Sequence, residues 1–169
     1  QQYFLPKDLL EQRVKEDKIP YDKWAKRELL TLCEGNKVNY SEVTAWFKRM
    51  YEGYGIMPLW IGYDPWNSQY WVQEMKDMGF NMVLVRQGAK TLSQPMKEMA
   101  ADISAKRINY NNNPILKWCL TNTSVKRDDN DNIRPVKGKS QRQRIDGAVS
   151  LLIAYSVLFN NLQDYLNII

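Results

Sequence analysis

The chain has 169 residues, of which 44% are hydrophobic and 25% charged, as is typical of one globular domain with a sizeable core. It contains no histidine, which excludes Ser-His-Asp and Cys-His nucleophilic schemes, histidine general bases and zinc sites that need imidazole. No apolar run reaches the roughly 18–20 residues of a membrane span and no charged, then apolar leader opens the chain, so we expect no membrane association. The net charge of +5 favours an acidic partner such as nucleic acid.

The two cysteines, Cys33 and Cys119, lack the spacing of a metal site or of a disulfide framework. We therefore expect buried free thiols in a reducing compartment. Any catalysis must then depend on carboxylates, lysines or a metal ion held by oxygen ligands.

The opening part of the chain predicts short elements separated by turns. Its first residues already have the composition of a strand, so we expect the domain to extend upstream of residue 1. Ser41 is the expected N-cap of a helix that Gly55 ends. The elements expected are a strand over 3–6, helices over 8–17 and 21–24, a strand over 29–33 and a helix over 41–54.

The next part predicts a strand–helix–strand unit with parallel strands. The first strand should end at about Asp64, because Pro65 cannot donate a ladder hydrogen bond. Asn67 and Ser68 are candidate N-caps for the helix, and Gly79 suits the position just after its last turn. The elements expected are an apolar strand over 57–63, a helix over 67–78 and a second apolar strand over 81–85.

The rest of the chain predicts helices around a β-hairpin. Asp146 lies in the first turn of the final helix, where the helix dipole favours an anion. The elements expected are a helix over 93–106, a brief helix over 114–118, hairpin strands over 121–126 and 133–136, and a long helix over 145–161.

Asp64 is the first candidate for a functional residue. An acid at the end of a strand and just before a helix lies where open α/β sheets bind their ligands, and the loop over 87–90 should reach the same edge. A second interpretation is an aspartate that only ends the strand and accepts hydrogen bonds from turn amides. The residues alone leave both interpretations open.

Asp64 and Asp146 together suggest a metal site. If the last helix packs beside the sheet, the two carboxylates can meet at one edge, and hard cations such as Mg²⁺ or Mn²⁺ prefer oxygen ligands of this kind. Two such ions about 4 Å apart would activate a water and stabilise the leaving oxygen in phosphodiester cleavage. The alternative is that Asp146 caps its helix and pairs with Arg142 or Arg144.

A basic segment precedes Asp146 and would neutralise phosphates beside such a site. Its basic residues outnumber its acidic ones: Lys126, Arg127, Arg134, Lys137, Lys139, Arg142 and Arg144 stand against Asp128, Asp129 and Asp131. Within it, Gly138-Lys139-Ser140 resembles the end of a phosphate-binding loop, but position 133 is Ile rather than Gly. The acidic run lacks the spacing of a calcium loop, so we expect a solvated hairpin tip.

Several segments, met in a fixed order, resemble those of a known family. The two most specific are Gly62-Tyr63-Asp64-Pro65-Trp66-Asn67 and, about 80 residues later, Arg144-Ile145-Asp146-Gly147-Ala148-Val149-Ser150-Leu151. The others are Tyr3-Phe4-Leu5-Pro6, Ile19-Pro20-Tyr21-Asp22-Lys23-Trp24, Gly35-Asn36-Lys37-Val38-Asn39-Tyr40, Gln87-Gly88 with Leu92-Ser93, Trp118 with Asn122, and Lys137 through Ser140. Together they resemble the nuclease domain of the large terminase subunit of tailed bacteriophages over nearly the whole chain.

The resemblance implies an α/β fold of ribonuclease H-like type, a mixed sheet flanked by helices that here lacks its first strand. It makes 1–169 one terminase nuclease domain without the packaging ATPase domain. Asp64 matches the family's second metal-binding acid and Asp146 its third, whereas the first lies on a strand upstream. Gln143 stands where some relatives carry a histidine.

The activity implied is Mg²⁺- or Mn²⁺-dependent endonucleolytic cutting of concatemeric viral double-stranded DNA during packaging, in the cytoplasm of the bacterial host. Lys137, Lys139, Arg142 and Arg144 are expected to bind the DNA backbone. The partners implied are the terminase ATPase domain, the small terminase subunit and the portal. Two other hypotheses are another nuclease of the same fold, such as a resolvase or transposase, and a module that docks on DNA or the portal without cutting.

Overall fold

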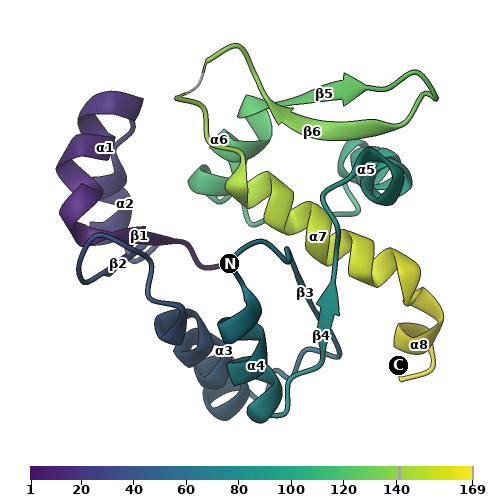
Figure 1. Cartoon of the computed structure of the whole chain (residues 1–169), viewed down its shortest axis with the longest axis horizontal. Helices are drawn as coiled ribbons and strands as arrows, with labels where there is room; N and C mark the ends of the chain where they lie inside the picture. Colours follow the sequence, from purple (N-terminus) through teal and green to yellow (C-terminus); the bar gives the residue numbers. More distant parts are fainter. Residues whose placement is uncertain (141, 169) are drawn as a thin grey trace. The chain divides into compact units, whose positions relative to one another are not determined.

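A computed structural model describes residues 1–140 and 142–168, and the chain divides into two compact units (Figure 1). Unit 1 is Gln1–Met57 and unit 2 is Pro58–Ile169. Among the described helices, none combines the length and the apolar character that crossing a membrane requires. Cys33 and Cys119 are both free and buried, as expected.

Unit 1 joins two short parallel strands to a set of helices. Leu5 pairs with Leu32 in the strand ladder. The N-cap of α3 is Asn39, whose side chain accepts a hydrogen bond from the backbone N–H of Ser41 (3.1 Å), so the prediction of Ser41 as the cap was wrong. The elements are β1 (Phe4–Pro6), a 3-10 turn (Lys7–Leu9), α1 (Leu10–Asp17), α2 (Tyr21–Lys26), β2 (Thr31–Cys33) and α3 (Tyr40–Tyr54).

Unit 2 begins with the expected strand–helix–strand unit, β3 (Ile61–Tyr63), α4 (Gln69–Asp77) and β4 (Met82–Leu84). The two strands are parallel, with Gly62 opposite Val83. β3 is shorter than predicted because Pro58 has no N–H to donate and the Leu59 carbonyl accepts from the Asn81 side chain instead (3.1 Å).

The remaining elements of unit 2 follow the predicted order. α5 begins four residues earlier than expected, which places Ser93 inside the helix. α6 is a turn longer than expected, since Asn113 caps it and the helix buries Ile115, Leu116 and Cys119. The elements are α5 (Ala89–Ser104), α6 (Pro114–Asn122), β5 (Thr123–Arg127), β6 (Ile133–Lys137), α7 (Asp146–Asn160) and α8 (Leu162–Leu166). Within the described residues the strands pair two by two, β1 with β2, β3 with β4, and β5 with β6.

Helix α7 is the central element of unit 2. In the view of Figure 1 it runs across the unit, with β3 and β4 on one side and α5, α6 and the hairpin on the other. It contributes three side chains to the main hydrophobic core, which consists of Val85, Leu92, Met96, Met99, Ile133, Leu152, Ile153 and Val157. The core thus joins the β4 edge, α5, β6 and α7.

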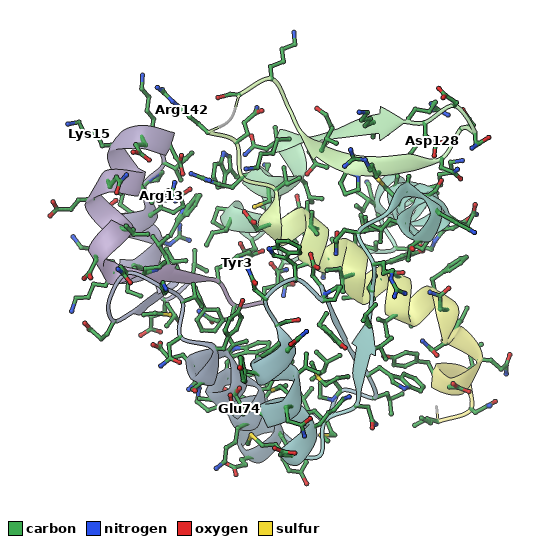
Figure 2. The ribbon with its side chains drawn as sticks, viewed as in Figure 1. Tyr3, Arg13, Lys15, Glu74, Asp128 and Arg142 are labelled. Carbon is green, nitrogen blue, oxygen red and sulfur yellow. The ribbon has the colours of Figure 1, made fainter. Side chains whose placement is uncertain are left out.

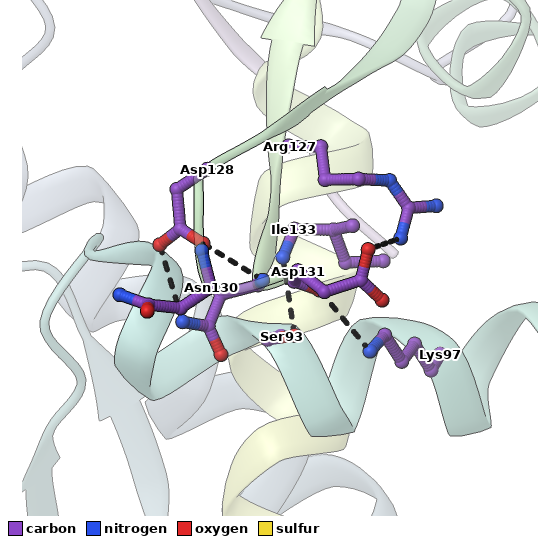
Figure 3. Close-up of polar contacts among 8 residues, drawn as sticks. Ser93, Lys97, Arg127, Asp128, Asn130, Asp131 and Ile133 are labelled. Carbon is purple, nitrogen blue, oxygen red and sulfur yellow. Dashed lines mark hydrogen bonds and ion pairs between the residues drawn. The ribbon is translucent and has the colours of Figure 1, made fainter.

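The hairpin is fixed to α5 by polar contacts at one end (Figure 3). The buried hydroxyl of Ser93 accepts a hydrogen bond from the backbone N–H of Ile133 (3.1 Å). Lys97, one turn further along α5, donates to the Asp131 carbonyl (3.4 Å). The hairpin therefore has a defined position on unit 2.

The acidic hairpin tip is a self-contained turn, as the residues predicted. Asp128 accepts hydrogen bonds from the backbone N–H groups of Asn132 (2.9 Å) and Asn130 (3.0 Å), and its Oδ2 accepts from the Asn132 side chain (3.1 Å). These bonds, led by the Asn132 backbone N–H, lower the pKa of Asp128. Asp131 pairs with Arg127 across the tip.

A second polar link joins α5 to α7. The Tyr155 hydroxyl donates to Asp102 (2.6 Å), which also pairs with Arg107 (2.5 Å). The Tyr155 hydrogen bond, and then that from Arg107, lower the pKa of Asp102. Burial, together with the hydrogen bond to Asp102, raises the pKa of Tyr155 to about 12.

Strand β3 lies so close to α7 that only glycine fits at position 62. A Cβ there would lie 2.7 Å from both Ile153 Cγ2 and Val157 Cγ2, and 3.3 Å from the Ile153 carbonyl oxygen. Atoms at such distances overlap, so a side chain at residue 62 would separate the strand from the helix.

We expect Gly62→Ala to lower the free energy of unfolding by about 1–3 kcal/mol, the usual effect of overpacking a core. Urea unfolding would measure it. Gly53→Ala is the matched control, because Gly53 lies inside α3 with no atom within 4 Å of the added Cβ. An unchanged stability of Gly62→Ala would contradict the close packing of β3 on α7.

Candidate metal and DNA site

Asp64 lies in a tight turn that follows β3. Its Oδ1 accepts a hydrogen bond from the backbone N–H of Trp66 (3.0 Å), and its carbonyl accepts from the Ser68 hydroxyl (2.7 Å). Ser68 therefore stands at the N-cap of α4 without making a side-chain cap bond to the helix. The turn interpretation therefore explains one carboxylate oxygen of Asp64. It is compatible with a ligand-binding role for the other oxygen.

Asp146 is the first residue of α7 and is exposed. The N-cap is Ile145, which makes no side-chain cap bond, so the alternative in which Asp146 caps the helix was wrong. In the first turn, the carboxylate lies near the positive end of the helix dipole, which stabilises its charge.

The strand and the helix run in opposite directions. Trp60, just before β3, stacks edge-to-face on Tyr165 in α8, with ring centroids 5.4 Å apart. Gly62 then lies against Ile153 and Val157. The chain from Trp60 to Gly62 therefore runs from beyond the end of α7 toward its beginning. The upward course of β3 and β4 in Figure 1 agrees with this direction.

This direction brings Asp64 toward the end of α7 where Asp146 lies. Asp64 is two residues beyond Gly62, just after the end of β3, an advance of about 7 Å at most. Asp146 is two helical turns before Ile153 and on the same helix face, about 10 Å along the axis. Both carboxylates thus lie at one end of the β3–α7 pair.

The segment entering α7 is held by the end of α6. The buried side chain of Asn122 donates to the Arg144 carbonyl (3.1 Å), and its own carbonyl accepts from the Gly138 N–H (3.0 Å). Asn122 therefore ties together the end of the hairpin and the start of α7. It fixes the backbone two residues before Asp146.

Cys119, one turn before Asn122, is buried beside the start of α7. Burial raises the pKa of its thiol most, the backbone N–H groups of Gly147 and Ala148 oppose this, and the negative charge of Asp146 raises the pKa further. The buried thiol thus lies beside the first turn of the helix that begins at Asp146.

The predicted DNA-binding residues run from Lys137, the last residue of β6, to Arg144, two residues before α7 begins. Lys137, Lys139 and Arg142 are exposed and Arg144 is half-buried. Figure 2 labels Arg142 far from Asp128 of the hairpin tip, near the opposite end of the hairpin.

Gln143 is turned back onto its own loop. Its Oε1 accepts from the Ser140 N–H (3.2 Å), and it lies over Gly138, where a Cβ would come within 2.5 Å of it. The Gln143 side chain thus makes its contacts within its own loop.

Gln87 opens the loop that the sequence predicted at the Asp64 edge, although no role was predicted for its side chain. β4 runs level with β3 to its end, where the Val85 N–H donates to the Tyr63 carbonyl (2.9 Å). Val85 faces α7, so Gln87, two residues on, follows on the Asp64 side of the sheet. Its buried Nε2 has no hydrogen-bond partner among the described residues, and such a donor suits an anionic ligand.

The donor set fits a hard cation in part. Among the described residues no three or more of the Cys, Asp and Glu side chains gather as a metal-binding group. Asp64 and Asp146 are oxygen ligands of the type that Mg²⁺ or Mn²⁺ takes, and Mg²⁺ in particular keeps several waters and binds through one or two carboxylates with substrate phosphates. The two carboxylates are therefore of the ligand class that a hard cation takes, and they are fewer than the three that would form a metal-binding group.

A family model described as the terminase large subunit, endonuclease domain, matches residues 2–160. Protein YmfN of Escherichia coli (strain K12) is 30% identical over 136 residues, which are 79% of this chain and 29% of that protein. The large terminase subunit of Enterobacteria phage HK97 is 27% identical over 154 residues, which are 90% of this chain and 30% of that protein. A crystal structure of the HK97 bacteriophage large terminase matches with a TM-score of 0.81 at 26% identity, covering 91% of this chain and 32% of that one.

The chain belongs to the endonuclease domain family of the terminase large subunit. The family resemblance inferred from the residues is thereby confirmed. The mixed α/β fold matches that of the HK97 protein and is consistent with the ribonuclease H-like prediction. The chain spans about a third of the length of the relatives it matches.

We expect Asn122→Ala to lower the free energy of unfolding by about 1–3 kcal/mol, because the Arg144 carbonyl loses the hydrogen bond from the buried Asn122 side chain. Chemical denaturation would measure this. Thr121→Ala is the control, since Thr121 is exposed and its hydroxyl donates to the Lys117 carbonyl in its own helix (2.9 Å), and it should change stability by less than about 0.5 kcal/mol. Equal effects of the two substitutions would show that Asn122 does not anchor the start of α7.

Proposed function

We propose that this chain is the metal-dependent endonuclease domain of a terminase that cuts concatemeric viral double-stranded DNA during genome packaging. Membership of the endonuclease domain family supports this. The observation that supports the site assignment is the packing of Gly62 on Ile153 and Val157, with Trp60 on Tyr165; from it we infer that Asp64 and Asp146 lie at the same end of β3 and α7.

In this proposal Asp64 and Asp146 hold Mg²⁺ or Mn²⁺, with water and the scissile phosphate as further ligands. The family resemblance adds an acid on a strand upstream of residue 1. When bound, the ions supply an activated water and stabilise the leaving oxygen. One oxygen of Asp64 accepts from the Trp66 N–H, so the second would bind the ion, and the unpartnered Gln87 amide would donate to an anionic oxygen of the substrate.

The basic segment before α7 would bind the DNA backbone through Lys137, Lys139, Arg142 and Arg144. Because Asn122 fixes the Arg144 backbone, phosphates held by this segment would lie beside Asp146. The terminase ATPase domain, the small terminase subunit and the portal are the protein partners we propose for the full-length protein.

Asp64→Asn and Asp146→Asn in the full-length protein should each reduce Mn²⁺-dependent plasmid nicking by at least about a hundredfold, since an amide is a poor ligand for a hard cation. Gel assays over a range of Mn²⁺ concentrations would measure the loss. Asp164→Asn, an exposed acid in α8 at the opposite end of α7, is the control and should nick normally. Unreduced nicking by Asp64→Asn or by Asp146→Asn would contradict the assignment of that aspartate to the site.

Replacing Lys139 and Arg142 together by alanine should reduce the slope of log binding constant against log salt concentration by about 2, one unit for each lost phosphate contact. Binding of a labelled duplex at several salt concentrations, in EDTA, would give the slope. A double alanine variant of Lys15 and Lys23, two exposed lysines of unit 1, is the control and should retain it. The same slope in both double variants would place the DNA contact elsewhere.

A further inference from the structure

We propose that Trp66 and Tyr70 form a stacking platform for nucleobases beside Asp64, so that the site acts on DNA whose bases are locally unpaired at the point of cutting. The inference rests on the proposed function and names the form of DNA that the same site takes. It is carried by two exposed aromatic rings next to a candidate metal ligand.

Both rings project into solvent. Trp66 is 80% exposed and Tyr70 is 95% exposed, although aromatic side chains of this size usually bury most of their surface. The opposite side of α4 is packed normally, with Val72 and Met75 buried. Trp66 lies in the turn two residues before the N-cap Ser68, and Tyr70 is the second residue of α4, so both rings belong to the segment that enters the helix.

The turn that carries Trp66 is well fixed. Its N–H donates to the Asp64 carboxylate (3.0 Å), and the Ser68 hydroxyl closes the turn onto the Asp64 carbonyl (2.7 Å). Pro65 restricts φ immediately before Trp66, and Asn67 holds a left-handed φ of 57° immediately after it. A ring on such a turn loses little backbone entropy when a ligand stacks on it.

The surroundings favour bases over phosphates at this point. From residue 63 to residue 73, Asp64 is the only charged residue, and the exposed polar neighbours of the rings are Asn67, Gln69 and Gln73. Aromatic rings and amides contact the faces and edges of bases, whereas the lysines and arginines before α7 suit phosphates. The aromatic surface beside Asp64 would therefore contact bases, and the basic segment before α7 would contact phosphates.

A base in an intact duplex is already covered on both faces by its neighbours. A stacking platform gains contact only with a base that has left the stack or lost its partner. A protein partner docked on Trp66 would cover Asp64, which the substrate has to reach, because the two residues are directly hydrogen-bonded. DNA is therefore the occupant that lets both features act together.

The test compares two DNAs bound by the full-length protein in EDTA, where no metal-dependent cutting occurs. One is a fluorescein-labelled duplex and the other is the same duplex with a short central stretch of unpaired bases. Fluorescence anisotropy should give tighter binding of the unpaired DNA. Trp66→Ala should reduce this preference about ten-fold, the order expected for one stacked base, and Tyr70→Ala should also reduce it.

Trp66→Phe keeps a ring and should retain most of the preference. Tyr54→Ala removes an equally prominent ring, 73% exposed, in unit 1 and should leave the preference unchanged. A preference that survives Trp66→Ala and Tyr70→Ala, or a wild-type protein with no preference, would overturn the inference. So would a change of oligomeric state in Trp66→Ala with DNA binding intact, because the rings would then form a protein contact.

This result is separate from that of the cutting assay. If the wild-type protein fails to nick DNA but Trp66→Ala loses the preference, the platform stands and the nuclease proposal fails. If nicking depends on Asp64 while the preference is unaffected by Trp66→Ala, the nuclease proposal stands and the platform fails.

Discussion

The close contact between Gly62 and α7 is the constraint on which the rest of unit 2 depends. Because residue 62 has no side chain, the strand backbone lies against Ile153 and Val157, and the Trp60–Tyr165 contact sets the direction of the strand. The ends of strand and helix that carry the acids therefore meet on one side. Without the contact of Gly62 with α7, nothing would bring together Asp64 and Asp146, which are about 80 residues apart in the sequence.

Much of this was predictable from local patterns. Pro65 placed the end of β3, the dipole argument placed Asp146 in the first turn of α7, and the apolar runs predicted the parallel strand pair. These features follow from residues adjacent in the chain. Family membership, read from ordered motifs, was predictable for the same reason and is confirmed.

Other features depend on contacts between distant segments and could not be predicted. The hydrogen bond from Asn122 to the Arg144 carbonyl, the buried amide of Gln87 and the shortening of β3 by the Asn81 side chain join residues that no local pattern relates. The exposure of Trp66 is of the same kind, because the composition of its turn is equally compatible with a buried ring. The sequence thus predicted the acids, whereas the structure supplies their surroundings.

The most direct test of the central claim is paramagnetic broadening by Mn²⁺ in the ¹⁵N-labelled chain, because it reports proximity to the ion even when binding is weak. If Asp64 and Asp146 share an ion, the amide signals around both should broaden together at the same low Mn²⁺ concentration, while those of α8 stay sharp. Broadening around one acid without the other would contradict a shared site.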